Sequence, residues 1–341
     1  MGNAVVQAHF SRRNVLAIGA GSLAAACERQ SGIHWDLSQP WGPMEYHVVH
    51  ARQYADEVLK ATGGELNIHV HPGGTLGIKG PDTMRAVDEG IVDAADASAF
   101  QQVGVEPILG LESLPYMIET FDELRQFYAI TRPVIDAAYS RHNQKVLYVV
   151  PWPNQYFFLG REVTSVEQLA GLKIRTYDKL STDLAMNLKM TPVQMPTTDV
   201  VASLAAGSLD AVMTSTTTAW AQKYWDFLEY SFSTNHTWSC VIMSINNQSV
   251  AGLTPAQRDV VFGLAQQMEP GFWDVASRDD ADKRKILEGN GMKTIFPSAD
   301  LLAAMRAQAN PVVVNFMKAV PESVPLIEQF LERVGRPMVK V

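Results

Sequence analysis

The sequence predicts an α/β fold built from two lobes. Residues 171–213 alternate between short apolar strands and helical segments, in the order strand, helix, strand, helix, strand. This order is typical of a crossover unit with a parallel sheet. The chain from Glu28 to Val341 is also long enough to form two lobes with a core each.

Strands and helices alternate in the first half of the chain as well. We expect a helix over residues 45–62, because apolar residues recur there every three to five positions before Gly63-Gly64. Residues 66–71 alternate with period two and predict a strand that Pro72 ends. The other elements expected in this half are strands at 34–37, 94–97 and 145–150, and helices at 81–89 and 122–141.

Two segments of the second half carry the spacing of a helix capping box. Ser165 stands three residues before Gln168, and Thr254 stands three residues before Gln257. Each pair therefore predicts a helix start. Beyond them, we expect a strand in the run 238–246 and mainly helices from 267 to 341, with prolines at 297, 311, 321 and 325 as interruptions.

Residues 1–27 predict a targeting segment. The motif Ser11-Arg12-Arg13-Asn14-Val15-Leu16 is close to a twin-arginine export signal, and the apolar stretch after it is too short to span a bilayer. Ala24-Ala25-Ala26 fits ordinary signal-peptide cleavage, whereas Cys27 stands where a lipoprotein carries its acylated cysteine. Both processing routes stay open, and a buried N-terminal helix is the alternative to an export segment.

Charge and cysteine content narrow the function further. The formal net charge is −8, and removal of residues 1–27, which hold two arginines and no acidic residue, makes the chain more negative. Such a chain lacks the basic surface that nucleic acid requires, so an anionic ligand has to be captured by local groups. Cys240 is then the only cysteine away from the N-terminus, and we expect it to be a small core residue.

Arg175 is the main candidate for ligand binding. It ends the short strand Gly171–Thr176, and open α/β sheets bind ligands beyond the carboxyl ends of their strands. A guanidinium can hold a carboxylate through two parallel hydrogen bonds. The alternative is a structural ion pair with Asp178 or Asp183.

Several motifs resemble those of the solute-binding proteins of TRAP transporters. The sequences GLKIRT, PVQMPTTDVVASLAAG and LDAVMTS, between residues 171 and 215, are similar to the family's G-L-K-I-R strand, P-V-P-M-P helix entry and V-D-G-Q-E-N-P segment. Outside this region, HPGGTLG at 71–77, LPY at 114–116 and TNH at 234–236 resemble further family motifs in the same order. The resemblance implies a periplasmic receptor that delivers organic acids to a sodium-driven membrane permease.

The same resemblance implies a two-lobe, periplasmic-binding-protein-like (type II) fold with a hinge and with a strand and a helix that cross between the lobes. Lobe I would comprise residues 28–150 and about 239–270. Lobe II would comprise residues 151–238 and about 271–341, with the C-terminal helices. Contact with the membrane would occur only through the permease or a lipid anchor.

The resemblance also points to site residues around Arg175, although turn chemistry or core packing would explain each of them equally well. Many relatives carry a second arginine near residues 152–156, where this chain has none. The candidate ligand-binding residues besides Arg175 are Ser38, Gln39, Ser98, Trp152, Asn154, Gln155, Tyr156, Met195, Thr197, Thr214 and Trp220.

This composition favours a bulky or aromatic monocarboxylate over a four-carbon diacid, because the candidate site is rich in rings and poor in cations. No cofactor and no metal is expected: His69 with His71, and His47 with His50, lack a third ligand at metal-site spacing.

Two other classes of protein are weighed against the receptor. The receptor of an ABC importer or a ligand-sensing module would share the two-lobe architecture. A secreted enzyme is disfavoured, since the sequence contains neither a G-x-S-x-G nor an H-E-x-x-H motif.

Overall fold

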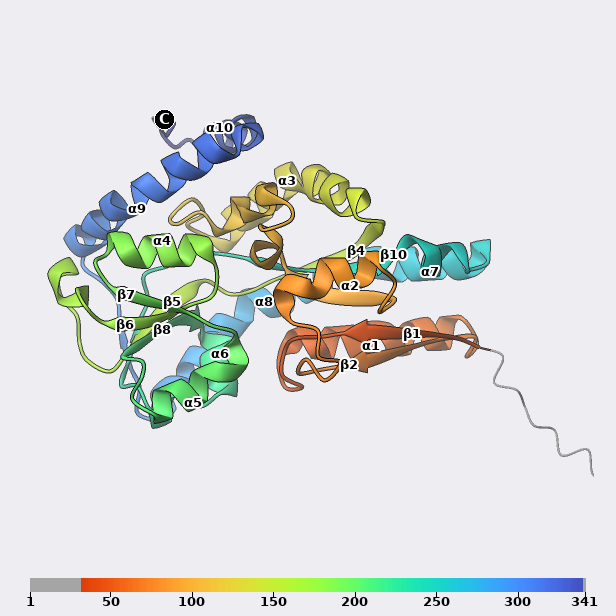
Figure 1. Cartoon of the computed structure of the whole chain (residues 1–341), viewed down its shortest axis with the longest axis horizontal. Coiled ribbons are helices and arrows are strands. Elements are labelled where there is room, and N and C mark those ends of the chain that lie inside the picture. The colour runs from red at the N-terminus through yellow and green to blue at the C-terminus, as the bar shows by residue number, and fades with distance from the viewer. Residues whose placement is uncertain (1–31, 340–341) are drawn as a thin grey trace, which may run out of the picture. The chain divides into compact units, whose positions relative to one another are not determined.

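The computed structural model describes residues 32–339 (Figure 1). The predicted export segment, including the lipidation candidate Cys27, lies outside the described residues. Within residues 32–339, two sheets each form the centre of one lobe. This is the two-lobe type II α/β fold that the sequence predicts.

The first sheet contains five strands in the order β2-β1-β3-β10-β4. Strand β1 is parallel to β2 and β3, whereas β10 is antiparallel to β3 and β4. Buried residues of α1 and α8 form a core with one face of this sheet, and those of α3 form a core with the other. The bounds are β1 Ile33–Ser38, α1 Tyr46–Ala61, β2 Leu66–His71, α2 Thr83–Asp88, β3 Ala94–Ser98, α3 Phe121–Arg141, β4 Gln144–Pro151, β10 Cys240–Asn246, α7 Asn247–Ala251 and α8 Pro255–Gly289.

The second sheet contains six strands in the order β11-β9-β5-β8-β6-β7. Strand β6 is parallel to both β7 and β8, which confirms the crossover unit predicted for residues 171–213. The bounds are β5 Gln155–Leu159, β6 Lys173–Thr176, α4 Lys179–Asn187, β7 Thr191–Gln194, α5 Val200–Ala205, β8 Ala211–Ser215, α6 Thr216–Ala221, β9 Tyr230–Phe232, β11 Lys293–Ile295, α9 Ala299–Ala319 and α10 Val324–Arg333.

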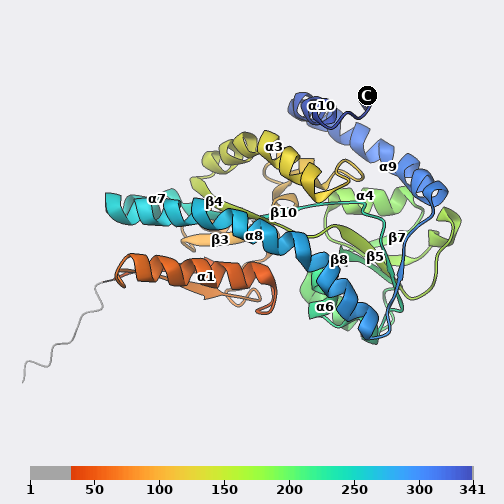
Figure 2. The same cartoon turned by 180° about the vertical axis from the view of Figure 1, so that it is seen from behind.

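The chain crosses between the lobes at a strand and at a helix. Strand β10 follows β9 along the chain but lies between β3 and β4 of the first sheet. Helix α8 packs against α1 and β4 of the first lobe and against α6 of the second, as Figure 2 shows from behind. The predicted lobe boundaries stay a prediction: the one near residue 270 falls inside α8, and α10 packs against α3.

Some local expectations were wrong. The side chain of Ser165 caps nothing, because residues 166–169 form only a short 3₁₀ helix and the Gln168 Oε1 accepts a hydrogen bond from the Thr164 N at 2.7 Å. Pro311 lies inside α9 rather than at its end, and the late strand starts at Cys240 rather than Trp238. The sequence reading also missed β11, which has only three residues.

Among the helices of residues 32–339, none is both long enough and apolar enough to cross a membrane.

Candidate ligand-binding site

A cavity of about 490 Å³ lies between segments of the two lobes. On the first-lobe side, it is lined by residues that follow β1, β2 and β3; on the second-lobe side, by residues at or after the ends of β6, β7 and β8. Ligands of open α/β sheets bind at this edge. The lining includes Trp41, Lys79, Gly80, Ser98, Phe100, Gln101, Trp152, Gln155, Arg175, Tyr177, Met195, Thr197, Asp199 and Thr214.

Arg175 is held rigidly inside this cavity. Its side chain is 4% exposed. The Nε donates to the Met195 carbonyl oxygen at 3.1 Å, Nη1 to the Met213 carbonyl oxygen at 3.0 Å and Nη2 to the Thr197 Oγ1 at 3.1 Å. A guanidinium has five N–H donors, so one donor on Nη1 and one on Nη2 stay available for a carboxylate.

Neither carboxylate considered as a structural partner of Arg175 pairs with it. Asp178 instead caps α4, where it accepts from the Ser181 N at 2.7 Å, and Asp183 pairs with the Lys179 Nζ at 2.6 Å. Within residues 32–339, no carboxylate oxygen lies within 4.0 Å of the Arg175 guanidinium. The site therefore holds a buried cation that has no direct ion-pair partner within the described chain.

Burial lowers the pKa of Arg175, because desolvation disfavours the charged form. The nearby Tyr224, Tyr177 and Asp178 oppose that shift. An anion placed against the two free N–H groups would offset the cost of burying the charge.

Two hydroxyl groups in the lining are oriented by neighbouring donors. The Thr197 Oγ1 accepts from Arg175, and the Ser98 Oγ accepts from the Trp152 Nε1 at 3.2 Å. Since each oxygen acts as an acceptor in these bonds, its own proton is free to be donated to a ligand oxygen. Thr214, at the end of β8, adds a third buried hydroxyl group.

Aromatic rings form the apolar walls. Trp41 and Trp152 meet edge to face, with ring centroids 5.1 Å apart, and Phe100 lies 4.8 Å from Tyr177. Trp152 also packs on the ring of the buried His47 at 3.9 Å. Ring pairs of this geometry give a stiff apolar surface.

The cavity brings together seven of the candidate residues and leaves five out. The seven are Ser98, Trp152, Gln155, Arg175, Met195, Thr197 and Thr214; Ser38, Gln39, Asn154, Tyr156 and Trp220 do not line it. Side chains alternate along a strand, so Tyr156 points away from the side on which Gln155 faces the cavity, and its hydroxyl donates to the Asp280 Oδ2 at 3.0 Å.

The other outlying candidates have partners elsewhere. The Gln39 Nε2 donates to the Asp96 Oδ2 at 2.5 Å, and Ser38 is buried at the end of β1. The Lys283 Nζ lies 3.7 Å from the ring centroid of Trp220. Asn154, in the turn between β4 and β5, is partly exposed.

Sequence reasoning missed Lys79, Gln101, Asp199 and Phe100, all of which line the cavity. Each lies in a loop or a short 3₁₀ helix. Asp199 is part of the motif PVQMPTTDVVASLAAG but was not singled out as a site residue, and no motif marks the other three. Lys79 is a second cation in the lining, away from residues 152–156, where the chain lacks the second arginine of many relatives; unlike Arg175, it is exposed.

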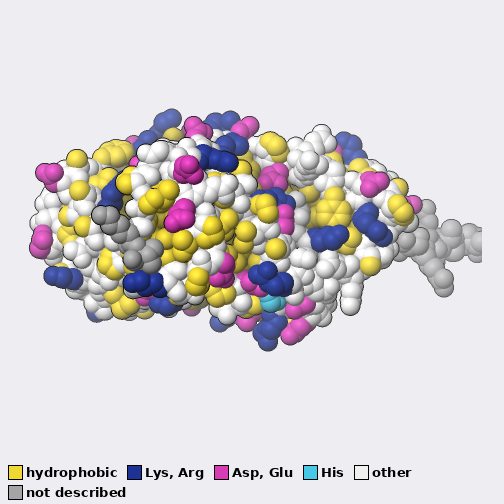
Figure 3. All heavy atoms as spheres, turned by 90° about the horizontal axis from the view of Figure 1, so that it is seen from above, with side chains coloured by type: hydrophobic (Ala, Val, Ile, Leu, Met, Phe, Trp, Pro, Cys, Tyr) yellow, Lys and Arg dark blue, Asp and Glu magenta, His cyan; other side chains and the backbone are white. Residues whose placement is uncertain are grey.

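The surface suggests that an anion is captured locally rather than steered by a broad field. On the face shown in Figure 3, basic and acidic side chains are interspersed. Interspersed charges produce weaker long-range potentials than a segregated patch. No group of three or more His, Cys, Asp or Glu side chains in the described part of the chain could hold a metal ion.

Comparisons with known proteins agree on one family. Residues 37–319 match the family model of the bacterial extracellular solute-binding proteins, family 7. The chain is 24% identical, over 293 residues, to the 2,3-diketo-L-gulonate-binding periplasmic protein YiaO of Escherichia coli K12, a match that covers 82% of this chain and 86% of the relative.

Solved structures show the same fold. The chain is similar to DctP7, an extracytoplasmic solute receptor of Bordetella pertussis that binds pyroglutamic acid, with a TM-score of 0.85, 23% identity, and coverage of 88% of this chain and 100% of the other. It is also similar to a pyroglutamate-specific TRAP solute-binding protein from a marine metagenome, with a TM-score of 0.83, 25% identity, and coverage of 89% and 99%.

Proposed function

Because this chain belongs to family 7 of the bacterial extracellular solute-binding proteins, and so to the receptors of TRAP transporters for small organic acids, we propose that it captures a bulky or aromatic monocarboxylate in the periplasm. It then delivers this ligand to a sodium-driven membrane permease. The observation that carries the proposal is the buried guanidinium of Arg175, which has no carboxylate partner within residues 32–339 and keeps two donors free.

The charges of the lining favour a ligand with a single carboxylate. Arg175 is the buried cation, whereas Lys79 and Asp199 are exposed and opposite in sign, so they balance each other. The lining is therefore left with one net positive charge, which one carboxylate neutralises. A second carboxylate would have to be desolvated without a matched cation.

The walls favour a ring or another bulky apolar group. Trp41, Trp152, Phe100 and Tyr177 surround the space beside Arg175. Pyroglutamate, the ligand of two similar receptors, is a small polar ring with one carboxylate, so it supports a ring-bearing monocarboxylate, whereas the aromatic walls are what favours a bulkier apolar one. The hydroxyl groups of Ser98 and Thr197 would bind further ligand oxygens.

Binding rather than catalysis fits the groups present. No histidine occurs among the described residues that line the cavity, and the one carboxylate in that lining, Asp199, is exposed. The serine and threonine hydroxyls therefore have no adjacent base to activate them. The described lining suits a receptor that encloses its ligand unchanged.

A thermal-shift screen against organic acids, followed by calorimetry, tests the proposal. The panel contains aryl and branched-chain monocarboxylates, pyroglutamate, sugar acids and succinate. We expect the largest stabilisation from a ring-bearing or bulky monocarboxylate, because at equal concentration the ligand with the lowest Kd stabilises the folded protein most. A ligand present at 100 times its Kd adds about 2.7 kcal/mol to the free energy of unfolding. A marked preference for succinate would contradict the monocarboxylate assignment, and no binding of any acid would contradict the receptor function.

A further inference from the structure

Lys79 and Asp199 form an opposed pair of charges in the cavity lining. Lys79 comes from the first lobe, just before the 3₁₀ helix Gly80–Asp82, and Asp199 comes from the second lobe, at the end of the 3₁₀ helix Thr197–Asp199. Both side chains are exposed, so both lie where the cavity opens to solvent.

Neither charge is engaged by another charged group in the described chain. Within residues 32–339, no ion pair within 4.0 Å involves Lys79 or Asp199. The Asp199 Oδ1 accepts only from the neighbouring Thr198 Oγ1, at 3.2 Å, and the Asp199 side chain does not cap α5. Both groups are thus free to pair with each other or with a ligand.

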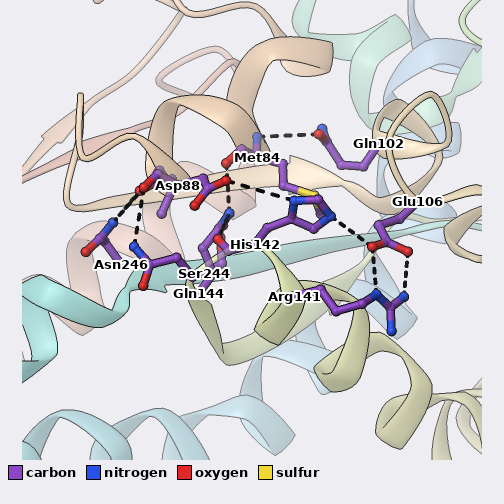
Figure 4. A network of polar contacts seen from close by, with 11 residues as sticks. Met84, Asp88, Gln102, Glu106, Arg141, His142, Gln144, Ser244 and Asn246 are labelled. Carbon is purple, nitrogen blue, oxygen red and sulfur yellow. Dashed lines mark hydrogen bonds and ion pairs between the residues drawn. The ribbon is translucent and has the colours of Figure 1, made fainter.

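The loop that carries Lys79 has a fixed base. The Gln102 Nε2 donates to the Gly80 carbonyl oxygen at 2.7 Å, and the Gln144 Nε2 donates to the Met84 carbonyl oxygen at 2.8 Å. Figure 4 shows how this polar network continues to Ser244 on β10. The Gln101 side chain packs directly against Gly80, since a Cβ at position 80 would lie only 2.3 Å from it.

The segment before Lys79 is held within the first lobe as well. Gly73, Gly74 and Gly77 all have positive φ angles, which glycine adopts without strain. The Gly73 N donates to the Trp41 carbonyl oxygen at 2.7 Å, the Gly74 N to the Gln39 carbonyl oxygen at 2.9 Å and the Gly77 N to the Gly74 carbonyl oxygen at 2.9 Å. The backbone therefore fixes where Lys79 starts, and its long, exposed side chain is the part that can reach toward the second lobe.

We propose that Asp199 determines the charge selectivity of the receptor by pairing with Lys79 when the lobes close over a ligand. This inference rests on the proposed carboxylate-binding function. In this ion pair, Asp199 neutralises Lys79, which is the only cation besides Arg175 in the described lining. A second carboxylate on the ligand then finds no free cation and faces Asp199 instead, so monocarboxylates are preferred over dicarboxylates of the same shape.

The test compares ligands that differ only in this second charge. Glutaramate against glutarate, and 4-carbamoylphenylacetate against 4-carboxyphenylacetate, replace a neutral amide by an isosteric carboxylate. Calorimetry gives the ratio of the two affinities, amide over carboxylate, for the wild type, Asp199→Asn, Lys79→Gln and the double variant. Glu162→Gln, an exposed acid outside the cavity, is the control.

In Asp199→Asn, the released Lys79 should bind the second carboxylate, and we expect the ratio to fall about fivefold, the limit for one exposed ion pair. In the double variant, which lacks the lysine, the dicarboxylate should not gain affinity in this way, and the ratio should not fall. An unchanged ratio in Asp199→Asn would overturn the proposal. An equal fall of the ratio in the double variant would also overturn it, because Asp199 would then repel the second carboxylate whether or not Lys79 is present.

A second readout follows the ion pair itself. Lys79→Gln and Asp199→Asn should each speed the dissociation of the amide ligand by up to about fivefold, and the double variant should be no faster than either single variant. Additive effects would contradict the pairing. If the wild type binds no acid of the screening panel, the proposed function fails and this inference fails with it. If it binds other monocarboxylates of that panel but no member of either ligand pair, the same ratio is measured with the best-bound monocarboxylate and its carboxylated analogue, and an unchanged ratio in Asp199→Asn overturns this inference alone.

Discussion

At the level of single residues, the candidate site is built around the positive charge of Arg175, which is buried away from water. The backbone carbonyls of Met195 and Met213 and the hydroxyl of Thr197 orient Arg175, but neutral acceptors only partly replace the water that burial removes. In the proposed complex, a ligand carboxylate would pair directly with Arg175, and removal of one partner of such a desolvated pair costs about 2–5 kcal/mol.

Several other buried carboxyl groups hold their protons more tightly than usual. Burial raises the pKa of Glu45 and of Asp96 to about 7 and that of Glu112 to about 8. The Glu112 Oε1 accepts from the Cys240 N at 2.6 Å, where β10 begins. At neutral pH, Glu112 is therefore mainly an uncharged acceptor beside the crossing strand.

Glu112 should make the protein less stable as the pH rises. Its pKa lies near 4.5 in the unfolded chain and near 8 in the folded one, so between these values the folded state holds a proton that the unfolded state has lost. The free energy of unfolding then falls with rising pH, by on the order of a few kcal/mol. Urea unfolding at pH 5 and pH 8 should show this fall in the wild type and a smaller one in Glu112→Gln, which keeps the acceptor.

Glu162→Gln, at an exposed position, provides the matched control and should keep the wild-type pH dependence. If Glu112→Gln loses as much stability as the wild type between the two pH values, Glu112 is not the group responsible.

At the scale of elements, sequence signals worked where the local pattern decides the structure. Period-two alternation gave β2 with its observed bounds, Leu66–His71, and the crossover unit around Arg175 was confirmed. Sequence signals failed where tertiary packing decides the local structure. Pro311 removes one hydrogen bond from α9, yet the helix continues because Val312, Val313 and Phe316 are buried in a core.

The two capping boxes show the same limit. Thr254 and Gln257 make both reciprocal bonds at the start of α8, whereas Ser165 makes none, because the chain after it does not continue as an α-helix. The spacing of residue types is identical in the two places, so only the structure distinguishes them.

Thr254→Ala should lower the free energy of unfolding by about 1 kcal/mol, because it removes an acceptor for the Gln257 N–H at the first turn of α8. Ser165→Ala is the matched control, and urea unfolding should show almost no change for it. Equal losses in the two variants would mean that the cap of α8 contributes nothing specific to stability.

At the scale of the whole molecule, the cavity exists only because two sheets bring their strand ends together. Arg175 and Thr214 come from the second sheet, whereas Ser98 and Trp41 come from segments of the first. Periodicity cannot reveal such a meeting. The resemblance supplied the lobes and their crossing strand, and it pointed to Arg175, Ser98 and Thr197.

Lys79 and Gln101 could not be found in this way, because a polar residue in a loop or a short 3₁₀ helix carries no signal of its own. Asp199 lies within the motif PVQMPTTDVVASLAAG, but the motif does not show that its side chain faces the cavity. That these three residues line one cavity is seen only in the structure.

In the proposed receptor, Arg175 grips the ligand carboxylate between the lobes. Calorimetry of Arg175→Ala with the acid that stabilises the wild type most tests it directly, with Arg161→Ala, at an exposed arginine outside the cavity, as the control. We expect Arg175→Ala to fold normally and to bind at least about 30-fold more weakly, the equivalent of about 2 kcal/mol, while Arg161→Ala binds like the wild type. An Arg175→Ala variant that keeps the wild-type affinity would contradict the account.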